Sequence, residues 1–214
     1  MDAAFEVLSE AELERVTSTY APLAQAVRDL IDATIQTQAD DELVLQARAV
    51  IEAVTQSLRS QPIRRSGVVS YRKDGRPLPL GNAATGPCNP IAPPVIVHHD
   101  GAAGDGRCWS EFVLGAAYEG PPGLVHGGVC ALVLDHLLGE AASQGLTKPL
   151  FTGTITVKYL RGTSLGPLRC EAWVDRTEGV KAFAQGFISD AAGITVQAEG
   201  VFIKPAWARE DPGS

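Results

Sequence analysis

The stretch from His126 to Asp135 combines residue types that could carry out chemistry on a carbonyl group. His126 is followed by Gly127 and Gly128, where a bend rich in proline and glycine passes into a long apolar segment. If a helix begins there, its first backbone N–H groups have no internal acceptor and carry partial positive charge. Two glycines allow a ligand to approach those groups closely. The pattern indicates a site for a carbonyl oxygen that becomes negative, although a tight turn alone would also use two glycines.

Asp135 is a carboxylate within that apolar segment. Its helix neighbours three and four positions away are all small or apolar: Ala131, Leu132, Leu138 and Gly139. Desolvation among such groups is expected to raise the pKa of a carboxyl group, which suits a general base or a nucleophile. The alternative is a carboxylate that caps a neighbouring loop. His136, on the adjoining face, is predicted to be a half-buried packing residue.

Other reactive side chains give weaker signals. Thr152 begins the next extended segment, where its hydroxyl could orient water or substrate, but threonine is common at such positions for its strand propensity alone. His98 and His99 are adjacent on a predicted strand, so they point to opposite faces and cannot share one metal. Cys130 has no base nearby in the sequence, so a cysteine nucleophile is not expected.

Neither a metal nor a cofactor is expected. The four cysteines form no C-x-x-C pair and no metal-ligand spacing. The sequence also lacks a phosphate-binding P-loop, a G-x-S-x-G motif and a dinucleotide fingerprint. The acidic first 25 residues do not resemble a secretory signal. We therefore predict reduced thiols and a cytoplasmic protein.

Composition narrows the class of partner. The 214 residues are 45% hydrophobic and 20% charged, which is ordinary for a globular chain with a full core. The net charge of −7 argues against general binding to nucleic acid or to anionic membranes. No apolar run reaches the length of about 18 residues that a membrane-spanning helix needs, so membrane insertion is not expected.

Three helices are predicted in the first 60 residues. Ser9 and Glu12 form a capping box, Pro22 suits the first turn of a second helix, and a third helix follows Asp40 and Asp41. The two longer helices each carry one apolar stripe, formed by Leu23, Ala26, Val27, Leu30, Ile31 and Thr34 and by Leu43, Ala47, Val50, Ile51, Val54 and Leu58. Because neither stripe contains a polar residue placed for chemistry, we predict an element for docking or oligomerisation.

The remaining chain predicts an α+β domain. Residues 61–94 are broken by proline and glycine, with a short strand at 68–72. Two extended segments at 93–100 and 107–115 are joined by a glycine-rich turn, and a helix follows at about 126–144. Four strands complete the chain, at 150–161, 168–179, 180–190 and 193–204, the last two joined through Ala191, Ala192 and Gly193. Since the connections are too short for crossover helices, we expect a mainly antiparallel sheet wrapped around one helix.

The stretches GPPGLVHGGVCALVLDHLLG and FTGTITVKYLR together resemble the hot-dog fold acyl-CoA thioesterases, in particular the PaaI-like and THEM-type group. Members carry H-G-G at the start of the central helix and an acidic residue nine positions later, as His126 and Asp135 are placed here. Thr152 matches a serine or threonine that opens the next strand, and Tyr159 and Arg161 match a tyrosine followed by a basic residue. The resemblance spans residues 89–206. It implies a helical extension at 1–65, a connecting segment at 66–90 and a hot-dog domain at 91–208.

This resemblance implies hydrolysis of an acyl-CoA thioester without a cofactor. The thioester carbonyl would accept hydrogen bonds from the backbone at Gly127 and Gly128, while His126 shapes the loop and polarises the carbonyl. Asp135 would activate water or attack the acyl carbon directly, with Thr152 holding the water. The chain departs from some relatives at Glu119, where they place an asparagine or glutamine, and a carboxylate is a poor oxyanion donor unless protonated.

The resemblance also implies partners. Its active sites lie at a subunit interface, so a homodimer or a dimer of dimers is expected, with Asp135 facing the H-G-G loop of the other subunit. The CoA moiety would lie along the surface, with Arg161 and Tyr159 as candidate contacts; a thioester on a carrier protein is the alternative. Two other functions stay open: a hot-dog hydratase or dehydratase using His126 or His136, and a non-catalytic acyl-CoA sensor that signals through the N-terminal helices. The surroundings of Asp135 and the position of Thr152 favour hydrolysis.

Overall fold

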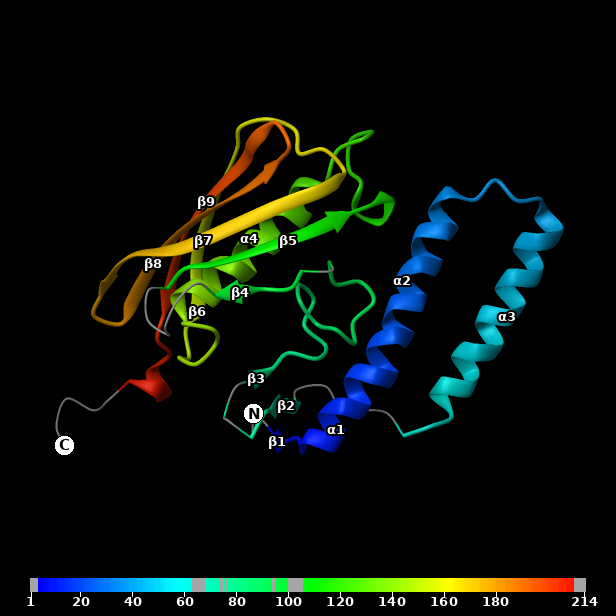
Figure 1. Ribbon diagram of the computed structural model, residues 1–214, viewed down its shortest axis with the longest axis horizontal. Coiled ribbons are helices and arrows are strands. Elements are labelled where there is room, and N and C mark those ends of the chain that lie inside the picture. Colours follow the sequence, from blue (N-terminus) through cyan, green and yellow to red (C-terminus); the bar gives the residue numbers. More distant parts are fainter. Residues whose placement is uncertain are drawn as a thin grey trace.

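An antiparallel sheet curves around one central helix in the computed structural model, which describes residues 4–62, 68–73, 75, 77–93, 95–99 and 106–209. The helix is α4 (Gly127–Ala142), and the six strands lie in the order β4-β5-β7-β8-β9-β6 (Figure 1). Their bounds are β4 His98–His99, β5 Cys108–Leu114, β6 Phe151–Tyr159, β7 Gly166–Glu178, β8 Lys181–Asp190 and β9 Gly193–Ile203. This architecture confirms the predicted α+β class and the hot-dog arrangement.

The core lies between α4 and the concave face of this sheet. Alternate residues of β7 and β8 are buried, as expected for strands with one face turned inward. Leu134, Leu137 and Leu138 of α4 are fully buried against them. Truncating such a leucine to alanine typically costs about 2–5 kcal/mol. The apolar segment around Asp135 is therefore the central element of the domain, which fixes the position of every residue on it.

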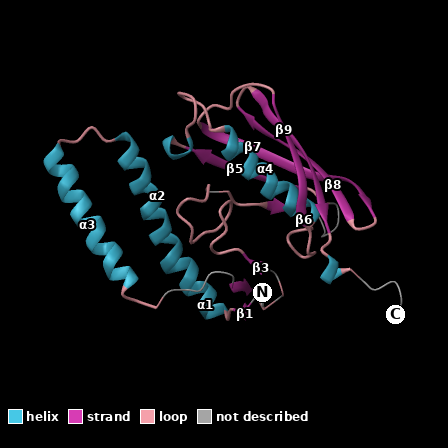
Figure 2. Cartoon of the chain, turned by 180° about the vertical axis from the view of Figure 1, so that it is seen from behind, coloured by secondary structure: helices cyan, strands magenta, loops and turns pink. Residues whose placement is uncertain are grey.

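The N-terminal helices form as predicted and lie beside the sheet domain. They are α1 (Glu10–Arg15), a π-helical turn (Val16–Tyr20), α2 (Ala21–Gln36) and α3 (Asp41–Arg59). The capping box of α1 and the Asp40 cap of α3 are both present. Arg28 of α2 donates to the backbone oxygen of Asn89 at 3.3 Å, which ties α2 to the connecting segment. Helix α3 buries none of its residues and is the outermost element in both views (Figures 1 and 2).

A second, three-stranded sheet lies next to α1 and was only partly expected. The strand predicted at 68–72 is confirmed as β2 (Val68–Tyr71). It pairs in parallel with β1 (Ala4–Val7), which the sequence analysis did not identify, and antiparallel with the short β3 (Pro77–Leu78). This sheet connects the start of the chain to the segment that leads into the sheet domain.

The prediction of an extended segment at 93–100 is largely wrong. In its described part only His98 and His99 form a strand, and they pair with Trp109 and Cys108. The glycine-rich turn predicted between the two segments lies outside the described residues, except for Gly106. The segment instead packs as an irregular layer, in which Val95 joins the main core. The hydroxyl of Tyr118 donates to the backbone oxygen of Ala92 at 2.9 Å and fixes the same layer.

A buried polar cluster attaches this layer to α4. The carboxylate of Glu140, at 8% exposure for the residue, lies 3.4 Å from His136 Nε2 and 3.5 Å from His99 Nε2. His136 Nε2 is also 3.1 Å from the hydroxyl of Thr85 in the connecting segment. The prediction of a packing role for His136 is therefore confirmed, and His136 faces this cluster.

Replacing Glu140 by alanine is expected to lower the free energy of unfolding by about 1–2 kcal/mol, because the largely buried His136 and the more exposed His99 lose their shared acceptor. Denaturant unfolding monitored by circular dichroism measures the change. Glu52→Ala is the matched control, since Glu52 is exposed and pairs only with Arg48 on the same helix face; its expected effect is below about 0.5 kcal/mol. Equal stability of the two variants would show that the cluster contributes nothing.

Candidate functional site

The turn before α4 presents one free backbone donor. His126 caps the helix, and its Nδ1 accepts from the backbone N–H of Gly128 at 3.0 Å. The N–H groups of Val129 and Cys130 donate to the backbone oxygen of His126. Among the described hydrogen bonds, the N–H of Gly127 has no acceptor. The predicted oxyanion position therefore has one available N–H, that of Gly127, while that of Gly128 is used by His126.

The loop that leads into this turn is held by its own contacts. Glu119 Oε1 accepts from the backbone N–H of Gly123 at 2.6 Å. The backbone N–H of His126 donates to the oxygen of Tyr118 at 2.9 Å. A Cβ on Gly120 would lie 2.8 Å from the Cα of His126, so only glycine fits there without displacing the loop. Glu119 thus fastens the loop as a hydrogen-bond acceptor.

Asp135 and Thr152 meet at the far end of the helix face. Thr152 Oγ1 donates to Asp135 Oδ1 at 2.9 Å. The pairing of β6 with β9 shifts between Thr152 and Thr154, and such a bulge re-aims the side chains beside it. Asp135 is partly buried, so the carboxylate expected among small and apolar helix neighbours keeps some exposure in the single chain.

Tyr159, at the other end of β6, fastens the first turn of α4. Its hydroxyl donates to the backbone oxygen of Gly127 at 2.8 Å, and desolvation raises the pKa of that hydroxyl. A Cβ on Gly127 would lie 3.2 Å from the tyrosine ring, so the ring and a glycine at this position fit each other. The structure thus places Tyr159 beside the candidate oxyanion donor.

Tyr159→Phe is expected to lower kcat for thioester hydrolysis about fivefold with KM unchanged, since one hydrogen bond of about 1 kcal/mol that positions Gly127 is lost. Steady-state kinetics measure the split between kcat and KM. Tyr20→Phe is the matched control, because its hydroxyl accepts from Arg15 on the N-terminal helices. An unchanged kcat in Tyr159→Phe would contradict a positioning role.

The two halves of the candidate site lie far apart within one chain. Gly127 and Asp135 are separated by about 12 Å of helix at 1.5 Å per residue. Along β6, Thr152 and Tyr159 are separated by about 23 Å at 3.3 Å per residue. A reacting carbonyl must lie about 3 Å from both its donor and its attacking group. If both halves act on one substrate, they must therefore come from two different chains.

The exposed edge of β6 is suited to a second copy of the chain. On the side away from β9, no strand of the described chain pairs with it. Phe151 and Tyr159, at its two ends, are 59% and 52% exposed. A nine-residue edge with unpaired backbone groups is a template for another strand. If β6 pairs antiparallel with its own copy, Thr152 of one chain comes next to Tyr159 of the other.

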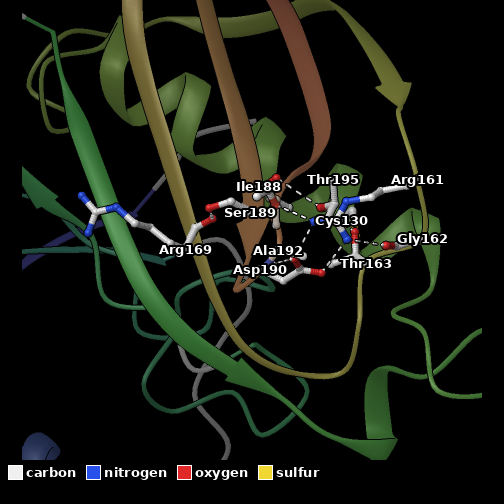
Figure 3. Close-up of polar contacts among 11 residues, drawn as sticks. Cys130, Arg161, Gly162, Thr163, Arg169, Ile188, Ser189, Asp190, Ala192 and Thr195 are labelled. Atoms are coloured by element: carbon white, nitrogen blue, oxygen red, sulfur yellow. Dashed lines mark hydrogen bonds and ion pairs between the residues drawn. The ribbon is translucent and has the colours of Figure 1, made fainter.

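Arg161 is held by an acidic partner (Figure 3). Its guanidinium donates to both carboxylate oxygens of Asp190, at 2.8 and 2.5 Å, and to the backbone oxygen of Gly193 at 2.8 Å. This pairing is the main reason why the pKa of Asp190 lies well below its usual range. Asp190 was not predicted as the partner of Arg161, because 29 residues separate the two in the chain. The contacts fix the turn between β8 and β9.

Cys130 lies behind this turn in a buried hydroxyl network. Its Sγ is 3.8 Å from Thr163 Oγ1, which donates to Thr195 Oγ1 at 2.7 Å, and Thr195 Oγ1 donates to the backbone oxygen of Ile188 at 3.1 Å. Burial raises the pKa of the Cys130 thiol. A buried thiol with a raised pKa is a poor nucleophile, which agrees with the expectation from the sequence.

The described residues contain neither a candidate metal site nor a candidate membrane-spanning helix. No group of three or more histidine, cysteine, aspartate or glutamate side chains there could hold a metal ion. No helix there combines the length and apolar character needed to cross a membrane. His98 stacks on Trp109, with ring centroids 4.4 Å apart, while His99 faces Glu140, so the two histidines point in different directions, as predicted.

Comparisons with known proteins match the sheet domain. Residues 122–196 match the family model described as the thioesterase superfamily. A crystal structure of a thioesterase superfamily protein, RHA08564, is 29% identical to this chain with a TM-score of 0.74. The match covers 86% of this chain and 90% of that one. Because residues 66–214 are a smaller share of this chain than 86%, the match includes part of the N-terminal extension. The resemblance drawn from the sequence is thereby confirmed.

Other solved structures match about half of the chain. A phenylacetic acid degradation-related protein from Ralstonia eutropha is 20% identical, covering 51% of this chain and 84% of that one, with a TM-score of 0.45. The phenylacetic acid degradation protein PaaI from Thermus thermophilus is 15% identical, covering 52% and 93%, with a TM-score of 0.46. No curated protein matches the chain by sequence.

Proposed function

Since the chain carries a hot-dog domain of the thioesterase superfamily, we propose that it hydrolyses acyl-CoA thioesters at sites shared by two copies of the chain. Similarity to the thioesterase superfamily supports thioester hydrolysis as the general activity. The observation that carries the proposal is the hydrogen bond from Thr152 to Asp135, which places a carboxylate beside an unpaired strand edge. The N-terminus of α4, with its free donor at Gly127, lies at the opposite end of the same edge.

The carbonyl oxygen of the thioester would bind at the start of α4. The N–H of Gly127, which has no acceptor among the described hydrogen bonds, would donate to this oxygen with the positive end of the helix dipole behind it. His126 adds a second donor: because its Nδ1 accepts from Gly128, the proton of a neutral imidazole lies on Nε2. Both donors would stabilise the oxygen as it becomes negative.

Asp135 would act as the base in the hydrolytic step. Its carboxylate accepts a proton from a water molecule, and the water oxygen attacks the acyl carbon to give a tetrahedral intermediate. The carbon–sulfur bond then breaks, the thiolate of CoA leaves and takes up a proton, and the free acid is released. Thr152 holds Asp135 through its donated hydrogen bond and can orient the water. Direct attack by Asp135 on the acyl carbon uses the same position.

The partner chain would complete each site. An antiparallel β6–β6 pair brings Asp135 and Thr152 of one copy to Gly127 and Tyr159 of the other, and its symmetry makes two such sites. The partner would also cover the exposed side of Asp135. We therefore propose a homodimer as the smallest active unit; a dimer of dimers would contain the same sites twice.

The positions proposed for CoA contacts are revised by the side-chain partners. Arg161 already binds Asp190 and the backbone of Gly193, so its charge is largely matched within the chain. Tyr159 uses its hydroxyl on Gly127. We propose that both residues shape the entrance to the site and that the CoA phosphates find their main cationic contacts elsewhere.

The two alternatives have weaker support in the site. A hydratase would need a histidine at the reacting carbon, but His136 faces Thr85 and Glu140, and His126 has only Nε2 available. A non-catalytic sensor would need no carboxylate held beside the strand edge. Release of free thiol from acyl-CoAs of short, long and aromatic acyl groups tests the proposal. Tight binding without turnover on the whole panel would favour the sensor.

A further inference from the structure

A cavity of about 650 Å³ lies at the C-terminal end of α4, away from the H-G-G turn. The loop after α4 forms one wall, and the ends of β7, β8 and β9 form the other. Its lining includes Gln144, Lys148, Leu150, Val174, Lys181 and Lys204. Its size falls within the range of about 300–1,000 Å³ typical of small-molecule sites.

Positive charge is concentrated in this cavity. The chain has five lysines and a net charge of −7, yet Lys148, Lys181 and Lys204 all line this one cavity. Among the described residues, no aspartate or glutamate lines it. In the described part of the chain, no carboxylate lies within ion-pair distance of these three side chains. Three ammonium groups that share one hollow repel one another unless an anion lies between them.

The walls between the lysines are apolar. Leu150, Val174 and Val180 offer hydrocarbon surface beside the ammonium groups. The loop wall is held in an unusual conformation, with Gln144, Gly145 and Leu146 at φ angles of 53°, 74° and 60°. Gln144 and Leu146 adopt this region although side chains disfavour it. The backbone N–H of Leu146 donates to Ser143 Oγ at 3.0 Å, which keeps the loop and Gln144 at the cavity.

The cavity lies near the candidate catalytic carboxylate but separate from it. Ala182, at the cavity, is the register partner of Phe202, and Phe202 is the partner of Thr152. Two strand spacings make about 10 Å between Ala182 and Thr152. Phe202, only 1% exposed, lies between the two residues on the intervening strand β9. A ligand in the cavity would therefore not contact Asp135 within the same chain.

We propose that this cavity binds a phosphorylated small molecule of nucleotide size, with Lys148, Lys181 and Lys204 neutralising the phosphate groups. Lysine binds phosphate as a point charge, and three such charges match a ligand with more than one phosphate. The apolar walls contact the ring or hydrocarbon part. Two ligands carry such phosphates. One is the nucleotide half of the acyl-CoA substrate, and this assignment rests on the proposed function. The other is a free nucleotide.

Calorimetric titration of the full-length wild type with CoA, ATP and inorganic pyrophosphate tests the site without requiring turnover. Lys181→Gln and Lys204→Gln are each expected to raise the Kd about fivefold to tenfold, because one charge-assisted contact is lost. Lys73→Gln is the matched control: it removes the same charge from an exposed turn outside the cavity and should leave the Kd unchanged. Absence of binding to the wild type, or equal Kd values in all variants, would overturn the proposal.

Kinetics distinguish the two sources. If the phosphates belong to the substrate, Lys181→Gln raises KM for an acyl-CoA with little change in kcat, and leaves hydrolysis of the acyl-N-acetylcysteamine thioester, which lacks the nucleotide, unaffected. If a free nucleotide is the ligand, KM for acyl-CoA stays at the wild-type value while the Kd for ATP rises. If no thioester is hydrolysed but the Kd differences hold, the proposed function fails and the binding site stands.

Discussion

Asp135→Asn is expected to lower kcat/KM for acyl-CoA hydrolysis by at least about a hundredfold, or about 2.7 kcal/mol in activation free energy. Asparagine keeps the shape of the side chain and can still accept the hydrogen bond that Thr152 donates to Oδ1. It cannot take a proton from water or attack the acyl carbon. The loss would therefore come from the chemical step, and release of free thiol measures it.

Thermal unfolding of the variant provides the control. The melting temperature should stay close to that of the wild type, because Asp135 is partly exposed and makes no ion pair among the described residues. Activity within about tenfold of the wild type in a folded variant would exclude Asp135 as base or nucleophile. A single turnover in ¹⁸O-labelled water tests the nucleophile role: label in the Asp135 carboxylate indicates an acyl-aspartate intermediate, whereas label in the acid product alone indicates that water attacks the acyl carbon.

Mixing two inactive variants is expected to restore about a quarter of wild-type activity, because each site in the symmetric dimer takes its two halves from different chains. One variant is Asp135→Asn. The other is Gly127→Val, whose branched side chain meets the Tyr159 ring and covers the free N–H. After joint refolding, half of the dimers are mixed. Each mixed dimer contains one site with both wild-type halves and one site with neither.

Each variant refolded alone is the control, and its activity should remain at least about a hundredfold below the wild type. Native mass spectrometry shows that mixed dimers form. If mixed dimers are present and the activity stays at the level of the separate variants, the site lies within one chain and the β6 pairing is wrong. Recovery would establish that the exposed edge of β6 joins the two halves.

Local sequence patterns were sufficient for most of the elements. The capping box at Ser9 and Glu12, the cap at Asp40 and the turn after Asp190 depend on contacts between residues a few positions apart. The segment at 93–100 misled the analysis because its apolar residues suggested a strand, whereas tertiary packing buries Val95 in an irregular layer. The strand β1 was missed because its pairing with β2 joins residues about 60 positions apart.

The candidate site shows the same division. The types and spacing of His126, Gly127 and Asp135 indicated carbonyl chemistry because residues on one helix have a fixed separation. The resemblance implied that Thr152 holds the water used by Asp135, but neither the bond from Thr152 to Asp135 nor the bond from Tyr159 to Gly127 was predicted. Arg161 was predicted to contact a CoA phosphate, but it binds Asp190 instead. The folding of the β8–β9 hairpin brings Asp190 next to Arg161.

The sequence by itself therefore determined the α+β class, the helix that carries Asp135 and the turn that frees a backbone donor, since helix and turn signals are local. Only the tertiary structure decided that β6 lies at the sheet edge, that Thr152 and Tyr159 on β6 bond to Asp135 and Gly127, and that three distant lysines meet at one cavity. The physical reason is that strand order and side-chain partners depend on packing between distant segments, which no local pattern encodes.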